Sequence, residues 1–447
     1  MRQSSPLGNR FWRLWAAIGV SSLGDGMVLV GFPLLALGYT HNPALVAGVA
    51  VAGKLLGPVV ALPAGALADR LNRKWLLVTI ELLQFALLGG YACCLLAGLD
   101  SLAAIYAVAF VLGALTVAFD CASAAAVPSL VTTHLLVKAN SRLDSVDLAG
   151  EEMVGRAIGG IAFAFARVVP FLADALSFLA SAAILPSAIP DNTPDRTATT
   201  LLTDLREGAR WFLRNPLLRV LGGVIAQLAF CQSVVLALLV LYATQDLHMS
   251  KAGYGLLLGV SAIGNIVGAL ASNRLHSVFG SGWCIVLAGV LAAVSYPVLA
   301  VTNSPVAACA ALALEALAIA AGNVAAVALR QSIVPPELQG RVGSATMTLI
   351  LLAFPLGALA GGLVAYAIGI RPTLLAAGCV QLAVMVIAAP RLLSRIRTLG
   401  HPVAGRPEEQ PVREPEQVIV LADIDGLPAG HVADQDERLP AGDDGFR

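Results

Sequence analysis

The sequence has little charge and few groups suited to catalysis. Only 13% of its 447 residues are charged, and 28 basic and 28 acidic residues balance to a net charge of zero. A balanced charge offers no electrostatic footprint for nucleic acid, so we expect no nucleic-acid partner. The seven cysteines lack metal-site spacing, and no G-x-x-x-x-G-K-[ST] phosphate loop occurs. The sequence therefore predicts no metal site, no cofactor, no ATPase and no enzyme.

Apolar residues are abundant instead. The hydrophobic fraction is 58%, and apolar runs longer than the roughly 20 residues that cross a hydrocarbon core recur along most of the chain. Helices satisfy their own backbone hydrogen bonds in lipid, so this pattern predicts an all-α integral membrane protein. The twelve expected spans cover residues 12–38, 44–67, 75–97, 102–127, 146–168, 171–190, 217–245, 253–274, 282–302, 306–330, 342–368 and 371–392.

The distribution of basic residues predicts the orientation of these spans. Arg and Lys gather in alternate loops, and such loops stay in the cytoplasm. Both termini are therefore expected to be cytoplasmic, in a bacterial-type inner (plasma) membrane. Four regions follow: a six-helix half at 1–190, a cytoplasmic connector at 191–216, a second six-helix half at 217–398 and a disordered cytoplasmic tail at 399–447.

An internal repeat relates the two halves. The tetrapeptide Gly-Ala-Leu-Ala at 65–68 recurs at 268–271, and the Gly159-Gly160 pair in span five recurs as Gly361-Gly362 in span eleven. Both offsets are close to 200 residues. The halves should therefore be pseudo-symmetric with the same topology, and the paired glycines should let helices approach closely.

A basic turn between spans two and three carries the strongest motif. Residues 65–74 read GALADRLNRK, and this spacing resembles the loop between spans two and three of major facilitator transporters. In that family the loop is a cytoplasmic gate. The resemblance assigns that role here to Gly65, Asp69, Arg70, Arg73 and Lys74.

Asn72 stands where the family usually has glycine. Asparagine tolerates a left-handed turn better than most residues, so we expect the turn to be kept.

Three more stretches resemble the macrolide-efflux and enterobactin-export branch of that superfamily. They are SSLGDG at 21–26, EGARWFLRNPLLRVL at 207–221 and the PPELQGRV segment within 334–342. The resemblance implies the major facilitator fold, with twelve transmembrane helices in two six-helix halves around a central cavity. It also implies a monomeric secondary transporter, a drug, macrolide or siderophore-like cargo, and export by alternating access through proton antiport, as in multidrug resistance.

Other functions remain open for the same fold. An importer or a lysolipid flippase would share these motifs, and a membrane sensor or assembly protein that does not transport is a further alternative.

Span five departs from the pattern of proton antiporters in the family. It has Arg156 before its glycine pair, where those antiporters often have a Gly-Pro pair, and this difference weakens the inference of proton antiport.

Ionisable residues inside spans are costly and are functional candidates by default. Asp25 and Lys54 both lie about 20 Å from the expected cytoplasmic end, so they could form a pair or bind substrate or protons. Glu315 in span ten has no obvious partner in the sequence and is a candidate coupling group. Asn323 is a candidate cavity residue, although an interhelical hydrogen bond would explain it equally well.

The remaining intramembrane charges suggest structural roles. Asp120 and Arg156 both fall in the cytoplasmic thirds of their spans, so we expect them to form an ion pair. Glu81 is placed near the gate, and Asp174 is expected to meet solvent at the outer end of span six.

Overall fold

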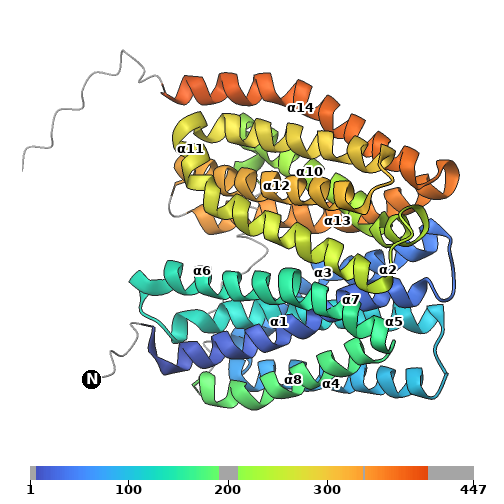
Figure 1. The fold of residues 1–447 in the computed structure, drawn as a ribbon. Helices are drawn as coiled ribbons and strands as arrows, with labels where there is room; N and C mark the ends of the chain where they lie inside the picture. Colours follow the sequence, from blue (N-terminus) through green and yellow to red (C-terminus); the bar gives the residue numbers. More distant parts are fainter. Residues whose placement is uncertain (1–6, 191–209, 336–337, 401–447) are drawn as a thin grey trace, which may run out of the picture. The chain divides into compact units, whose positions relative to one another are not determined.

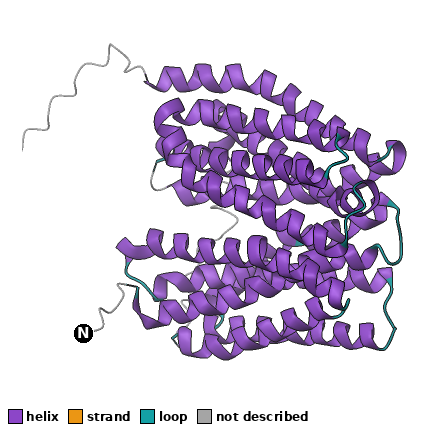
Figure 2. Cartoon of the chain, viewed as in Figure 1, coloured by secondary structure: helices purple, strands orange, loops and turns teal. Residues whose placement is uncertain are grey.

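A computed structural model of the chain describes residues 7–190, 210–335 and 338–400 (Figure 1). These ranges contain helices joined by short turns, and no strand occurs within them (Figure 2). Eleven of the described helices are long and apolar enough to cross a membrane, so the all-α membrane prediction is confirmed. The predicted connector and tail fall largely outside the described ranges.

Two elements of the first half differ from the predicted spans. Span two is interrupted at Leu56, and span five begins about ten residues early with a polar helix and passes through a π-helical segment. Hydropathy could not detect this early start, because residues 136–147 are mostly polar. The elements are α1 Gly8–Ala36, α2 Pro43–Leu55, α3 Gly57–Arg70, α4 Arg73–Leu96, α5 Leu102–Ala126, α6 Leu136–Asp147, η3 Leu148–Gly155, α7 Arg156–Phe165 and α8 Val169–Ala188, with short 3-10 turns at Val127–Ser129 and Thr133–Leu135.

The second half follows the predicted spans closely. Spans eight and nine form one continuous element that turns at Gly280, whose positive φ of 74° favours glycine. The elements are α10 Pro216–Leu241, η4 Tyr242–Asp246, α11 Lys251–Val301, α12 Pro305–Ile333, α13 Gln339–Ile368 and α14 Ile370–Gly400.

Helix starts follow from Asn-Pro pairs in the sequence. The Asn42 side chain accepts a hydrogen bond of 2.9 Å from the Ala44 amide, and Pro43 occupies the first turn of α2. Asn215 caps α10 in the same way, through the Leu217 amide at 3.0 Å. A side-chain acceptor before a proline satisfies a free amide and presets the backbone, so these helices begin where the sequence indicates.

Within each half, helices distant in sequence pack together. In the first half α1 and α4 both pack on α8, and in the second half α13 and α14 both pack on α10. The core of the first half includes an aromatic cluster. The Phe171 ring lies 5.2 Å from the Phe32 ring and 5.5 Å from the Tyr91 ring, centroid to centroid.

The two halves meet through the paired glycines. A Cβ atom on Gly160 of α7 would lie 2.6 Å from the Gly255 Cα in α11, and one on Gly362 of α13 would lie 2.6 Å from the Ala47 Cβ in α2. The other glycine of each pair faces its own half: Gly159 meets Met27 of α1 and Gly361 meets Val234 of α10. In each glycine pair, therefore, one glycine packs within its own half and the other packs against the other half.

These contacts between halves lie at one end of the helices. The end that carries Arg13, Arg73, Lys74 and Arg142 is called the basic end below. Gly362 lies near the opposite end of α13, and Gly160 lies in α7, the last helical segment of span five. Of the helices of the first half, α13 packs mainly on α2 and has few contacts with α3. The halves are thus closed together away from the basic end.

Arg371 should be the main polar clamp of that closed end in the second half. Its guanidinium donates to the Asp246 carboxylate at 3.1 Å, the Asn303 side chain at 2.6 Å and the Ala300 carbonyl at 3.3 Å. We expect Arg371→Gln to lower the free energy of unfolding by about 1.5–3 kcal/mol, since charge-assisted bonds are lost. Thermal unfolding in detergent measures this. Arg167→Gln is the control, because Arg167 is exposed and has one ion pair, to Asp100 at 3.4 Å. Equal melting temperatures for the two variants would contradict the clamp.

Candidate functional site

An acid-lined cavity of about 240 Å³ opens within the first half. Its lining includes Asp25 from α1, Asp120 from α5, and Asp144 and Asp147 from α6, and no Lys or Arg is among its lining residues. Four carboxylates without a lining cation favour a positively charged occupant or protons. This cavity is the first candidate site.

Asp25 is positioned by a polar stripe on α1. Ser21, Ser22 and Asp25 all line the cavity, and Ser22 donates hydrogen bonds to the Ile18 carbonyl and to the Asp147 carboxylate. Within the described chain Asp25 itself has no hydrogen bond and no ion pair. Its carboxylate is therefore available to a ligand from the cavity.

Two further acids are buried between the packed helices of the first half, near Asp25. Glu81 of α4 and Asp174 of α8 are both 0% exposed. Ser181 donates to one Glu81 oxygen at 2.6 Å, and Ser177 donates to one Asp174 oxygen at 3.0 Å. The second oxygen of each carboxyl group finds no partner among the described residues. Such groups are rare inside proteins, so these two acids are candidates for a functional site.

The sequence interpretation of these two acids was wrong. Asp174 does not meet solvent, and Glu81 bonds to α8 in the interior of the first half. Gly24 allows this arrangement, because a Cβ atom there would lie 2.2 Å from the Asp174 carboxylate. A signal was present in the sequence: Asp174, Ser177 and Ser181 are three and then four residues apart, which places them on one helix face.

The expected charge pairs also differ. Asp25 lines the cavity together with three other acids, whereas Lys54 is not among its lining residues. Lys54 lies in the last turn of α2, just before the break at Leu56. The depth of Lys54 in the membrane was calculated for a straight helix, and the break makes that calculation invalid. Asp25 and Lys54 therefore do not pair.

Asp120 and Arg156 do not form the expected pair. Arg156 instead lies 3.4 Å from Glu152 and 3.8 Å from Glu151, both in η3. The π-helical turn of η3 explains the difference, because its wider repeat brings residues four and five positions apart onto one face.

Glu152 also links the two halves. Its second oxygen accepts a hydrogen bond of 2.8 Å from the Asn265 amide in α11. Arg156, Glu152 and Asn265 thus form a polar contact between the halves in the middle of the packed helices.

Glu315 is buried in the second half, with 4% of its surface exposed. The Tyr296 hydroxyl donates to it at 2.9 Å, so one of its oxygens has a partner that the sequence did not suggest. Gln381, which is 0% exposed, has no hydrogen-bond partner for either side-chain atom among the described residues. The second half therefore contains its own buried polar groups.

The gate motif is described only in part. Helix α3 ends at Arg70, and the side chains of Gly65, Asp69 and Arg70 lie outside the description. Asn72 is extended, with a φ of −66°, and caps α4 by accepting from the Lys74 amide at 3.1 Å. The left-handed turn expected at Asn72 is therefore wrong. The gating role of these residues, including Arg73 and Lys74, stays a prediction.

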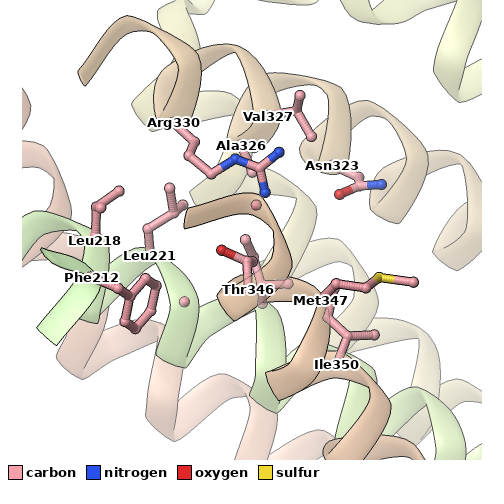
Figure 3. A pocket seen from close by; sticks show the side chains of 13 residues that line it. Phe212, Leu218, Leu221, Asn323, Ala326, Val327, Arg330, Thr346, Met347 and Ile350 are labelled. Atoms are coloured by element: carbon pink, nitrogen blue, oxygen red, sulfur yellow. The ribbon is translucent and has the colours of Figure 1, made fainter. Parts of the chain in front are cut away.

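A second cavity, of about 280 Å³, lies in the second half between α10, α12 and α13 (Figure 3). Asn323, one of the expected cavity residues, lines it together with Arg330 of the same helix. Most of the remaining lining is apolar.

Comparison with known proteins places this arrangement in a family. A family model described as "transmembrane secretion effector" matches residues 2–414. The chain belongs to this family. No curated protein matches its sequence.

Solved structures that resemble this chain show its fold. A bacterial homolog of the human lysosomal transporter Spinster, inward-facing and unoccupied, has a TM-score of 0.66 and 16% identity over 86% of this chain and 97% of its own. An inward-facing bacterial homologue of the iron transporter ferroportin gives 0.67 and 19%, over 85% and 98%. The nucleoside transporter NupG gives 0.66 and 12%, over 87% and 99%. The predicted major facilitator fold is confirmed, and the chain is a multi-pass membrane protein.

Proposed function

We propose that this protein is a secondary active transporter that exports a small amphipathic compound by alternating access, coupled to the proton gradient. The observation that carries the proposal is Asp25, a carboxyl group inside a membrane span that lines an acid-walled cavity and has no partner in the part of the chain that the structure describes. Glu81 and Asp174 extend this acid cluster into the helix interior. The cargo is a drug or a macrolide- or siderophore-like natural product, as the resemblance of residues 21–26 suggests.

The packing of the halves supports alternating access. They meet through Gly160 and Gly362 at the end away from the basic residues, which is the arrangement of an inward-facing transporter if the basic end is cytoplasmic. The bacterial ferroportin homologue supports the same state, because its inward-facing form has a TM-score of 0.67 and its outward-facing form 0.60. Asp25 then meets the cytoplasm in this state.

The acids provide a way to couple protons to cargo. A carboxyl group in a span can bind a proton in one state and release it in the other. A cationic or amine-bearing cargo would compete with protons for the same cavity, and this competition yields exchange. Glu315 is a second candidate for this coupling, in the other half.

Efflux measurements test the proposal. Cells expressing the chain are loaded with a panel of dyes and antibiotics, and efflux is followed with and without a protonophore. We expect efflux that the protonophore abolishes and that Asp25→Asn reduces to the protonophore-treated level, since the variant cannot release a proton. Asp100→Asn is the matched control, because Asp100 lies between α4 and α5 and pairs with exposed Arg167.

Additional variants in the same efflux experiment distinguish the alternative functions. Glu315→Gln shows whether the second half takes part in coupling, and deletion of residues 402–447 should leave efflux intact. If no compound is exported and only the tail deletion changes the cells, the protein is a sensor and the transport proposal fails. Accumulation inside expressing cells would show an importer.

A further inference from the structure

The cavity of the second half is lined by one charged residue, Arg330, and mostly by apolar side chains. Arg330 lies in the last turn of α12, and Phe212, Leu221, Met347 and Ile350 line the cavity around it. Figure 3 shows Arg330 and Asn323 on the α12 side, with Thr346 and Met347 facing them from α13.

The Arg330 guanidinium has no counter-charge within residues 7–190, 210–335 and 338–400. Among the described residues it makes no hydrogen bond and no ion pair. Gly343, which also lines the cavity, lies beside it: a Cβ atom on Gly343 would lie 3.9 Å from its Nη2 atom. A half-buried guanidinium carries five donors in a planar fork that matches carboxylate and phosphate groups. The vacant side of this fork faces the cavity.

The polar groups near Arg330 leave room for such an anion. The Thr346 hydroxyl already donates to the Val342 carbonyl at 3.0 Å, so it adds little donor capacity of its own. Asn323 is about two helical turns from Arg330 on the same lining and can donate through its amide. An anionic head group can therefore be held at one end of the cavity, and apolar walls surround the rest.

We propose that this cavity binds the head group of a small amphipathic anion, a carboxylate or phosphate on a short hydrocarbon body. The Arg330 guanidinium binds the head group, and Phe212, Leu221 and Ile350 contact the hydrocarbon. This inference rests on the proposed export function and narrows its cargo. The volume of about 280 Å³ is near the lower end of the roughly 300–1,000 Å³ of small-molecule sites, which favours a short body.

The charge of the two cavities makes the inference specific. The cavity of the first half presents four carboxylates, and the cavity of the second half presents one guanidinium. An anionic head group is repelled by the first and attracted by the second. A cargo with both an amine and an acid could use both.

Binding to purified protein in a neutral detergent tests the inference apart from transport. The probes are octanoate, octyl phosphate, octanol and octylamine, which share a chain and differ in the head group. Titration calorimetry should show that octanoate and octyl phosphate bind, whereas octanol and octylamine bind at least roughly tenfold more weakly, as expected for loss of a charge-assisted bond.

Variants identify the residue. Arg330→Gln should weaken octanoate and octyl phosphate by roughly tenfold or more, and Arg330→Lys should keep part of the affinity. Arg391→Gln is the matched control, because Arg391 is an exposed basic residue of α14 that bonds the Ile387 carbonyl and does not line the cavity. Melting curves establish that each variant is folded.

The outcomes are distinct. Equal binding of octanol and octanoate, or unchanged octanoate binding in Arg330→Gln, overturns the inference. If anionic phospholipid in nanodiscs competes with octanoate and phosphatidylcholine does not, the anion comes from the bilayer; otherwise it is a soluble cargo. Octanoate binding without any gradient-driven efflux of any compound would refute the export function and leave the anion site standing.

Discussion

Gly160→Leu is expected to prevent the two halves from closing at the end opposite the basic residues. A Cβ atom on Gly160 would lie 2.6 Å from the Gly255 Cα, and backbone cannot move aside as a flexible side chain can. Overpacking costs about 1–3 kcal/mol, which corresponds to a population change of roughly 5- to 150-fold in a two-state equilibrium. The state that is closed at this end should therefore lose population, and transport should fall with it.

Spin labels at Tyr39 and Val306 measure this change. Both positions are exposed near the closed end, one in each half. In a background without the seven native cysteines, the distance between the labels should shift to longer values in Gly160→Leu. Gly90→Leu is the control, because Gly90 lies in α4 with nothing within 4 Å of a Cβ atom. Unchanged distances in Gly160→Leu would show that this contact does not hold the halves together.

Phe171→Ala should cause the largest loss of stability. The Phe171 side chain is 0% exposed and makes edge contacts with Phe32 and Tyr91. Its removal leaves a cavity between α1, α4 and α8, and such truncations cost about 3–5 kcal/mol. Thermal unfolding of the purified protein in detergent should show a strongly lowered melting temperature.

Phe165→Ala is the matched control for this loss. Phe165 ends α7 and is 88% exposed, so its truncation creates no internal cavity. Phe171→Leu, which refills most of the volume, should recover part of the stability. If Phe171→Ala and Phe165→Ala unfold at the same temperature, the aromatic cluster does not stabilise the first half.

The sequence predicted where the helices begin and end better than it predicted the partners of the charged side chains. Asn42 and Asn215 with their following prolines mark helix starts through local chemistry, so they are visible in the chain itself. The partners of Arg156 and Lys54 depend on the π-helical turn of η3 and the break at Leu56, which no periodicity indicates. A depth estimate for a straight helix fails at both places.

The sequence also did not predict which polar side chains are buried. Asp174 lies near the outer end of its span, which suggested solvent, but its environment is set by Gly24 of a helix distant in the sequence. The polar spacing on α8 was nevertheless visible. If this stripe had been interpreted as one helix face, with no reference to its depth, it would have identified Asp174.

The seam of glycines also affects how fast the halves can part. Gly160 and Gly362 bring backbone against a glycine or an alanine, so separation breaks contacts between small groups and releases no interlocked side chains. Opening then requires no rotamer change at these points. The side-chain contacts that separation must also break include the hydrogen bond of Asn265 to Glu152 and the contact of the Lys251 ammonium with the Phe163 ring, 5.2 Å from its centroid.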